Sequence, residues 1–307
     1  MSRRHLAPKD AMETFQKAFR SSYRRAQITQ LSEAQRIMAS QSIEPAGEPV
    51  IPLGHPEHQS LRVGETEKAT AVVAFIDIRG CTKLAFALAQ EQLLLTVQSL
   101  TTASVRAIYD QGGYIGEFTG DGVMGYFGDS ETPDEDAVVA ALQATTLLFK
   151  TVKEIVNPEL RETGTPEIRI AAGLEYGEVL WSRIGIGETS QVKPISAATF
   201  LAGKLATHGY TKAWECKMGA WLASWVPSEF KDQTKSYEFS HGDKTFSHEL
   251  YNLDWENYAM AVLQDEESLA RRLKNTRLGT GSGAGAVAVG GYTERRQVTQ
   301  VKGGRFA

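Results

Sequence analysis

The sequence feature that most constrains the fold is an ordered pair of apolar segments, each of which carries one aspartate. The first, VVAFIDIRGCT (72–82), is rich in β-forming residues and reaches Asp77 near its end. The second, GGYIGEFTGDGVMGYFGD (112–129), holds two further β-rich runs around Gly120-Asp121-Gly122. Such runs bounded by glycine and aspartate predict strands, and the second segment predicts a hairpin. We therefore expect a strand over 71–78, a long helix over 82–110, and then the hairpin.

The pattern that follows extends this unit to an α+β domain. Acidic residues open an amphipathic segment over 134–156, which predicts a helix because the helix dipole favours acids in the first turn. The run IRIAAGLEYGEVLWSRIG predicts two strands around Gly177, SAATFLAGKLA (196–206) predicts a short helix, and LYNLDW predicts a closing strand. This order predicts a ferredoxin-like βαββαβ fold with an antiparallel-rich sheet backed by helices.

The sequence divides into three parts on the same grounds. Residues 1–68 are expected to form an N-terminal helix and linker arm, with Met12 and Phe15 at helical spacing and a proline- and glycine-containing stretch over 41–68. Residues 69–256 would be the principal domain. Residues 257–307 would form a C-terminal extension with a flexible tail, because 279–291 reads GTGSGAGAVAVGG.

Composition excludes several classes of function. The chain has 307 residues and a formal net charge of −4, whereas duplex-binding proteins concentrate strong positive charge, so nucleic acid is not an expected partner. No apolar run approaches the roughly 20 residues of a membrane helix, and no secretory signal is recognisable. The two cysteines, Cys81 and Cys216, fit neither a disulfide framework nor a metal knuckle. A cytoplasmic protein with reduced thiols is expected.

Asp77 and Asp121 are the leading candidates for a functional site. A carboxylate that ends a buried strand is costly unless something compensates its charge, whereas a hairpin aspartate between glycines is explained by a simple turn. In a ferredoxin-like sheet, however, the strand over 72–78 would lie beside the hairpin, and both carboxylates would meet at one sheet end. With a carbonyl of the strand they would form a hard oxygen site that suits Mg²⁺ or Mn²⁺. The turn Gly80-Cys81-Thr82 opens a helix whose first amides are suited to a phosphate, so this combination favours a nucleoside triphosphate.

These two segments resemble the signature segments of the class III nucleotidyl cyclases, the adenylate and guanylate cyclase catalytic domains, over roughly residues 69–256. The resemblance implies a head-to-tail homodimer with two sites at the interface. In each site, Asp77, the Ile78 carbonyl and Asp121 of one subunit would hold two divalent cations, and the partner subunit would supply base-reading and transition-state groups. The ribose 3′-hydroxyl would attack the α-phosphorus and release pyrophosphate, which gives a 3′,5′-cyclic nucleotide.

The resemblance also assigns residues that would read the base. Three residues before Gly120-Asp121 the family has lysine in adenylate cyclases and glutamate in guanylate cyclases, and here Glu117 occupies that position. Lys193 aligns with the second base-reading position, where the family has aspartate or cysteine. Glu117 fits guanine, the N3–H of uracil or the amino group of cytosine. Alternatively, Glu117 and Lys193 form an ordinary ion pair.

The short helix departs further from the family. Phe200 and Lys204 stand where the family has an asparagine that orients the ribose and an arginine that stabilises transition-state charge. Lys204 keeps the charge but lacks the forked geometry of arginine, and Phe200 cannot donate a hydrogen bond. Trp181 and Tyr176 are expected near the pocket, where they would either fill the space of a purine or pack in the core. Candidate triphosphate contacts, each equally readable as a surface charge, are Arg79, Lys83, Arg183, Lys231 and Lys235.

Because of these departures, the chain most resembles the bacterial pyrimidine (uridylate or cytidylate) cyclases of antiphage Pycsar systems. That resemblance implies conversion of UTP or CTP to a cyclic second messenger, cUMP or cCMP, that activates a separate effector. The alternatives are a guanylate or adenylate cyclase, or a degenerate cyclase-like module that binds nucleotide without turnover. A polymerase-like nucleotidyl transferase has the right acids but would need a basic template surface.

Overall fold

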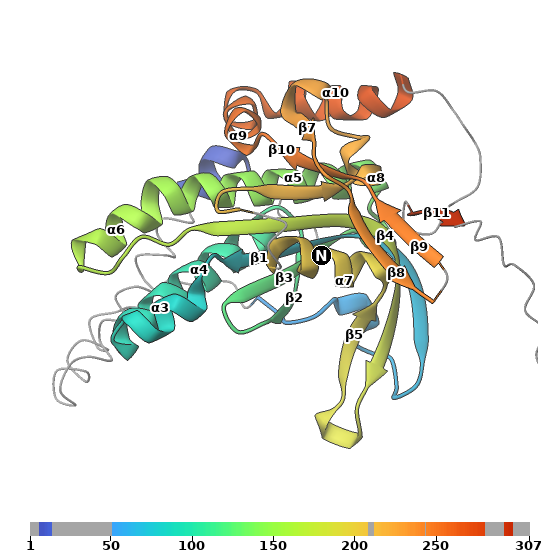
Figure 1. The fold of residues 1–307 in the computed structure, drawn as a ribbon, viewed down its shortest axis with the longest axis horizontal. Coiled ribbons are helices and arrows are strands. Elements are labelled where there is room, and N and C mark those ends of the chain that lie inside the picture. Colours follow the sequence, from blue (N-terminus) through green and yellow to red (C-terminus); the bar gives the residue numbers. More distant parts are fainter. Residues whose placement is uncertain (1–5, 14–50, 208–211, 243, 280–291, 297–307) are drawn as a thin grey trace, which may run out of the picture.

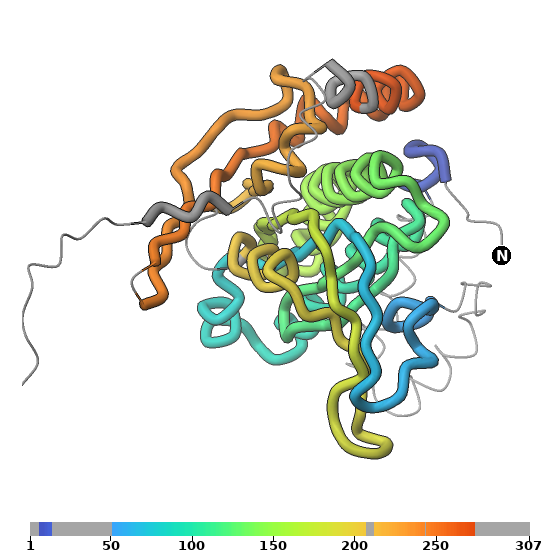
Figure 2. The backbone as a smooth tube through the Cα atoms, turned by 90° about the vertical axis from the view of Figure 1, so that its right-hand side faces the viewer, coloured from blue at the N-terminus to red at the C-terminus, as the bar shows by residue number. Residues whose placement is uncertain are grey.

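The computed structural model describes residues 6–13, 51–207, 212–242, 244–279 and 292–296. Most of the chain forms one large sheet with helices packed on both faces, from which the β4–β5 hairpin and the β8–β9 arm project in different directions (Figures 1 and 2). The α+β prediction with an antiparallel-rich sheet is confirmed.

The main sheet has eight strands in the order β2-β3-β1-β4-β6-β10-β7, with β5 paired to β4. Strands β4 and β6 run parallel, and the other neighbours are antiparallel. The strands are β1 (Thr66–Ile78), β2 (Tyr114–Phe118), β3 (Gly122–Phe127), β4 (Ile170–Ile184), β5 (Gln191–Ile195), β6 (Cys216–Gly219), β7 (Lys231–Gln233) and β10 (Leu250–Leu253).

Alternation along β1 decides what each face of the sheet buries. Val72, Ala74 and Ile76 point into the larger core, which also receives side chains from the long helices. Val73 and Phe75 point to the other face, into a smaller core that includes alanines of α7. Successive strand residues face opposite sides, so Asp77 belongs to the face that α7 covers.

Two helix predictions need correction in their boundaries. The helix expected over 82–110 is split into α3 (Cys81–Ala87) and α4 (Gln90–Asp110), because Leu88 and Ala89 adopt extended backbone with ψ of 152° and 151°. The helix expected over 134–156 is α5 (Asp134–Thr151), and it continues through a π-helical turn (Val152–Val156) into α6 (Asn157–Glu162). Pro158 is the second residue of α6, and proline is a common cause of helix irregularity because it lacks a backbone N–H.

One strand prediction was wrong. The run around Gly177 forms the single strand β4 rather than two strands, and it pairs with β1 from Thr66↔Ser182 to Ile78↔Ile170. Gly177 lies within that ladder opposite Ala71, so the chain does not turn there. The short helix α7 (Ala197–Thr207) and the closing strand β10 agree with expectation.

The C-terminal part of the chain contains helices and strands that the sequence analysis did not predict. The boundaries drawn at 68 and 256 fall inside β1 and α9, and the three-part division stays a prediction. Leu269 and Leu273 of α10 are buried in the larger core. These elements are α8 (Ala220–Ala223), α9 (Trp255–Gln264) and α10 (Glu266–Gly279), with a three-stranded sheet of β8 (Tyr237–His241), β9 (Lys244–His248) and β11 (Tyr292–Arg296).

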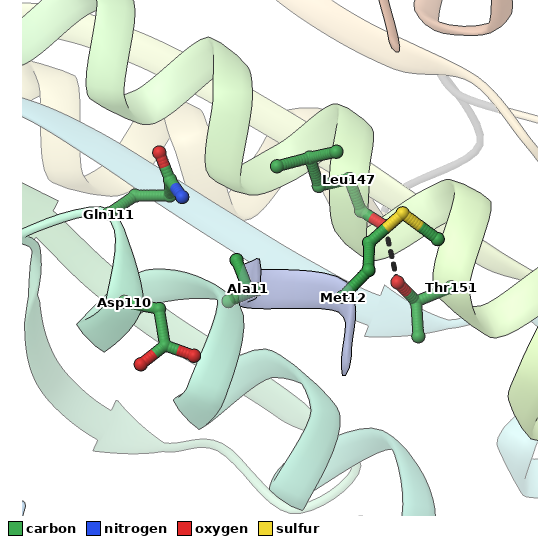
Figure 3. A pocket seen from close by; sticks show the side chains of 7 residues that line it. Ala11, Met12, Asp110, Gln111, Leu147 and Thr151 are labelled. Carbon is green, nitrogen blue, oxygen red and sulfur yellow. Dashed lines mark hydrogen bonds between the residues drawn. The ribbon is translucent and has the colours of Figure 1, made fainter. Parts of the chain in front are cut away.

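Part of the predicted N-terminal helix is described, over residues 8–13. Its Ala11 is buried, and Met12 lies beside Leu147 and Thr151 of α5 at a small cavity of about 10 Å³ (Figure 3). The amide of Leu6 also donates to the Asp110 carbonyl at 3.2 Å. The rest of the expected N-terminal helix, the arm over 41–50 and the glycine-rich tail from 280 to 291 lie outside the described residues. Among the described helices, none is both long and apolar enough to cross a membrane.

Candidate active site

Asp77 and Asp121 meet at one end of the sheet, as predicted. Asp77 pairs with Gly122 across β1 and β3, and Asp121 is the residue that precedes Gly122 in the hairpin turn. A Cβ on Gly122 would lie 2.9 Å from the Ile76 carbonyl oxygen, so a glycine is needed where the turn approaches β1. Gly120 has a φ of +76°, which supplies the left-handed residue of the turn. The hairpin therefore carries Asp121 directly against the end of β1.

The two carboxylates affect each other electrostatically. Asp77 is only 9% exposed. Burial, followed by repulsion from Asp121, raises the pKa of Asp77 to about 7, against an opposing effect of Arg79. An anionic pair in a desolvated position is destabilised unless a cation compensates it. This donor set fits the divalent cations that the sequence predicted, with Asp77, Asp121 and the Ile78 carbonyl as the groups that would hold them.

Arg79 provides a link between the aspartates and α7. Its Nη1 donates to the Ala206 carbonyl oxygen at 2.9 Å and lies 3.9 Å from Oδ2 of Asp77. Its backbone amide donates to the Arg169 carbonyl at 2.7 Å. The guanidinium is thus held between the C-terminal turn of α7 and the carboxylate site, rather than extending into solvent.

The turn Gly80-Cys81-Thr82 takes the form that its sequence predicts. Gly80 has a φ of 79° and precedes α3, whose first residues are Cys81 and Thr82. Burial, followed by the charge of the Asp121 carboxylate, raises the pKa of the Cys81 thiol to about 12. Cys81 is therefore a neutral thiol near Asp121. Whether these three residues contact substrate stays a prediction.

Glu117 and Lys193 form an ion pair within one chain, from β2 and β5 respectively. Both side chains are about one-third exposed, at 30% and 34%. The register of β2 shifts between Ile115 and Glu117, and such a bulge re-aims the following side chain. Gly116 allows this shift, since a Cβ there would overlap the ring of Tyr126 at 2.2 Å. The pair offers one acceptor and one donor side by side.

Phe200 and Lys204 lie one helical turn apart on α7, and both are exposed, Phe200 to 69%. The ammonium of Lys204 is 5.4 Å from the ring centroid of Tyr237 on β8, a contact that the sequence did not indicate. Gly173 of β4 lets α7 approach the sheet closely, because a Cβ there would be 2.2 Å from the Ala202 carbonyl oxygen. No sequence pattern distinguishes Gly173 from the other strand glycines.

The other residues that the sequence suggested as triphosphate or pocket contacts have structural roles elsewhere, or their proposed contact stays a prediction. Arg183 donates to the backbone carbonyls of Leu61 and Gln59 at 2.5 and 2.6 Å, which ties it to the arm before β1. Lys231 donates to the Ala223 carbonyl at 2.5 Å, and burial lowers its pKa. Lys83 and Lys235 are exposed, with no contact that marks a ligand role. Trp181 is a core residue at 1% exposure, and Tyr176 stacks on Trp221 at 3.6 Å between ring centroids.

Comparison with known proteins agrees with this geometry. The chain is 30% identical over 156 residues to a cytidylate cyclase from Escherichia coli, which covers 49% of this chain and 35% of that protein. It is also 30% identical over 137 residues to a cytidylate cyclase from Staphylococcus aureus, covering 42% of this chain and 31% of the relative. An adenylate cyclase from Anabaena cylindrica is 24% identical over 163 residues, 52% of this chain and 31% of the relative. The aligned part thus spans about a third of each curated relative, and no family model matches.

Solved structures give the same fold. The adenylyl cyclase CyaB from P. aeruginosa superimposes with a TM-score of 0.55 at 24% identity, covering 62% of this chain and 95% of that one. The guanylyl cyclase Cya2 superimposes with a TM-score of 0.53 at 18% identity, covering 61% of this chain and 92% of that one. The fold is that of the cyclase catalytic domains. Together with the sequence relatives and the paired aspartates, this fold supports a class III nucleotidyl cyclase domain.

Proposed function

We propose that the protein is a nucleotide cyclase that converts a pyrimidine nucleoside triphosphate, CTP in preference to UTP, into its 3′,5′-cyclic monophosphate and pyrophosphate. The observation that carries the proposal is the convergence of Asp77 and Asp121, together with a charge environment that favours a bound cation. A catalytically dead module would gain little from two carboxylates that repel each other at one end of a sheet.

The chain's own groups position the reactants. The Asp77 and Asp121 carboxylates and the Ile78 carbonyl would hold two Mg²⁺ or Mn²⁺ ions. When bound, these ions lower the pKa of the ribose 3′-hydroxyl and neutralise the triphosphate. Arg79 faces Asp77, with its Nη1 3.9 Å from Oδ2 of that carboxylate. The attacking oxygen bonds to the α-phosphorus as the bond to the departing pyrophosphate breaks, so positioning carries most of the catalysis.

The choice of base rests on two supports. The Glu117–Lys193 pair offers an acceptor to the cytosine amino group and a donor to the cytosine ring N3 or O2. Amino and carbonyl edges of purines also satisfy such a pair, so the pair by itself selects no base. The relatives named cytidylate cyclase favour CTP over the alternatives.

We also propose that the active form is a head-to-tail homodimer. Phe200 and Lys204 are exposed on α7, and Phe118 beside the aspartate turn is 51% exposed. A partner subunit that covers these side chains would bury apolar surface and complete each site with the charge of Lys204. The cytoplasmic location, the antiphage role and a separate effector that responds to the cyclic nucleotide belong to the same proposal and follow from the cyclases that the chain resembles.

The test is an incubation of purified protein with Mn²⁺ and each of the four ribonucleoside triphosphates, with products separated by chromatography and identified by mass. Cyclic CMP as the main product is the expected result. Cyclic GMP or cyclic AMP as the sole product would reject the pyrimidine assignment. Tight nucleotide binding without any product would identify a binding module, which the phenylalanine at position 200 would then explain.

A further inference from the structure

A compact group of metal-binding side chains lies in the segment that leads into β1. The sequence His55-Pro56-Glu57-His58 forms a short 3₁₀ turn, and both imidazoles are buried, each at 2% exposure. One nitrogen of each histidine and a carboxylate oxygen of Glu57 all lie within 4.8 Å of one another. Two histidines and one carboxylate form a ligand set that zinc-type ions favour.

Hydrogen bonds fix the protons on both imidazoles. Nε2 of His55 lies 3.0 Å from the Gly128 carbonyl oxygen, which can only accept, so Nε2 carries the proton and Nδ1 carries the lone pair. Nδ1 of His58 lies 2.8 Å from Oε2 of Glu67, which assigns the proton to Nδ1 and the lone pair to Nε2. Metal-binding histidines characteristically donate their other N–H to a carbonyl or a carboxylate in this way.

Nε2 of His58 is the observation that points to a ligand. It is buried and makes no hydrogen bond within the described parts of the chain. A buried polar nitrogen without a partner is costly, whether it carries a lone pair or a proton. A metal ion would satisfy it, because a neutral imidazole nitrogen is an established ligand.

Glu57 supplies the charge that the imidazoles lack. The backbone amide of Ser130 donates to Oε2 of Glu57 at 3.1 Å. The same carboxylate accepts from Oγ of Ser130 at 2.8 Å, which positions the side chain. Glu57 is therefore an anion fixed beside two imidazoles.

This cluster is separate from the aspartate site. His58 contacts Glu67 near the start of β1, whereas Asp77 lies ten residues later on the same strand. At about 3.3 Å per strand residue, roughly 33 Å separate the two ends. The His58 ring stacks on Trp181 at 4.6 Å between centroids, and the His55 ring is 4.2 Å from that of Tyr114. Neither imidazole can swing over to the catalytic end.

We propose that His55, Glu57 and His58 bind one divalent transition-metal ion of the zinc class, with water as a fourth ligand. Glu67 and the Gly128 carbonyl would position the imidazoles. Tetrahedral zinc ligands at 2.0–2.1 Å stand about 3.4 Å apart, so a small side-chain rotation closes the present spacing. The ion would cross-link the 3₁₀ turn before β1, whose imidazoles Glu67 and the Gly128 carbonyl hold at the opposite end of the sheet from the cyclase aspartates.

The binding test uses the Asp77→Asn/Asp121→Asn protein, in which the cyclase cation site is removed, so that its outcome is independent of the proposed cyclase activity. Protein stripped with a chelator is titrated with Zn²⁺ in competition with a chromophoric chelator, and with Co²⁺ for its visible absorption. The expected result is one equivalent per chain and a Co²⁺ spectrum typical of a tetrahedral site. In the same background, His58→Gln and Glu57→Gln should lose this equivalent, and Glu67→Gln should weaken it by about 10- to 100-fold.

Two comparisons keep the test decisive. His241→Gln removes an exposed histidine at the end of β8 and should leave the stoichiometry unchanged. Zn²⁺ should raise the melting temperature of the background protein but not that of Glu57→Gln, whose partly exposed side chain can be replaced without unfolding the chain. Zn²⁺ binding that is absent, or that is equal in the Glu57→Gln and background proteins, would overturn the proposal.

Discussion

Replacing Gly173 with alanine tests how closely α7 must approach the sheet. An added Cβ would lie 2.2 Å from the Ala202 carbonyl oxygen, 2.8 Å from the Leu205 Cβ and 3.0 Å from the Ala206 amide nitrogen. Two of these atoms belong to helix backbone, which cannot rotate aside as a flexible side chain would. The helix must therefore move away from β4, and it carries Phe200 and Lys204 with it.

The magnitude follows from packing. Overpacking of this kind costs about 1–3 kcal/mol of unfolding free energy, while alanine in a strand regains roughly 0.5–1 kcal/mol relative to glycine. Gly177, four residues along the same strand, is the matched control, because an added Cβ there meets the Ala198 Cβ at 3.5 Å, an ordinary contact. Gly177→Ala should be neutral or slightly stabilising, so the two variants should differ by about 2 kcal/mol.

Urea denaturation followed by circular dichroism measures this difference, and thermal melting should separate the variants by about 4–8 °C for a domain of this size. If the protein is a cyclase, Gly173→Ala should also reduce turnover well below its melting temperature, because α7 would supply the Lys204 charge. Equal stability of Gly173→Ala and Gly177→Ala would refute the close packing of α7 on β4.

Three further results are expected. Asp77→Asn and Asp121→Asn should each lower turnover by at least about 10³-fold with an unchanged circular dichroism spectrum, because the cation site is lost while the core is kept. Mixing two inactive proteins, Asp77→Asn and Lys204→Ala, should recover about a quarter of wild-type activity if half of the dimers are mixed and each has one intact site; no recovery would contradict a shared site. Asp110, whose pKa burial raises from 3.8 to about 6 despite its ion pair with Arg106, binds a proton more tightly in the folded state. Stability should therefore fall as pH rises from about 4 to 6, by up to about 3 kcal/mol, and Asp110→Asn should remove that slope in urea titrations.

The sequence was sufficient where the determinants of structure are local. The hairpin at Gly120-Asp121-Gly122 follows from turn residues between β-rich runs, and the start of α5 follows from its acidic first turn. The β-rich apolar run over 72–78 likewise placed Asp77 near the end of a buried strand. Because strand pairing then fixes neighbours, the meeting of Asp77 with the hairpin was predictable as well.

Other features depend on contacts that are distant in sequence. The glycine at position 177 predicts a break between two strands, but its pairing with Ala71 keeps β4 continuous. The segment before β1 was assigned to a linker from its prolines and glycines, whereas Gly128 and Glu67 hold its histidines in the interior. Single-sequence patterns carry no record of such partners. The contact between Glu117 and Lys193 was anticipated only because the family resemblance placed both at base-reading positions, where an ion pair was one of two alternatives.

Arg79 has a consequence for how two catalytic centres would work together. In the proposed dimer, its neighbour Asp77 serves one centre, whereas α7, which it holds at the Ala206 carbonyl, serves the other. Any shift of the guanidinium as nucleotide enters the first centre would be transmitted to the helix that completes the second. Substrate binding in such a dimer would then be cooperative. The cooperativity would be positive if α7 moved toward the second centre and negative if it moved away.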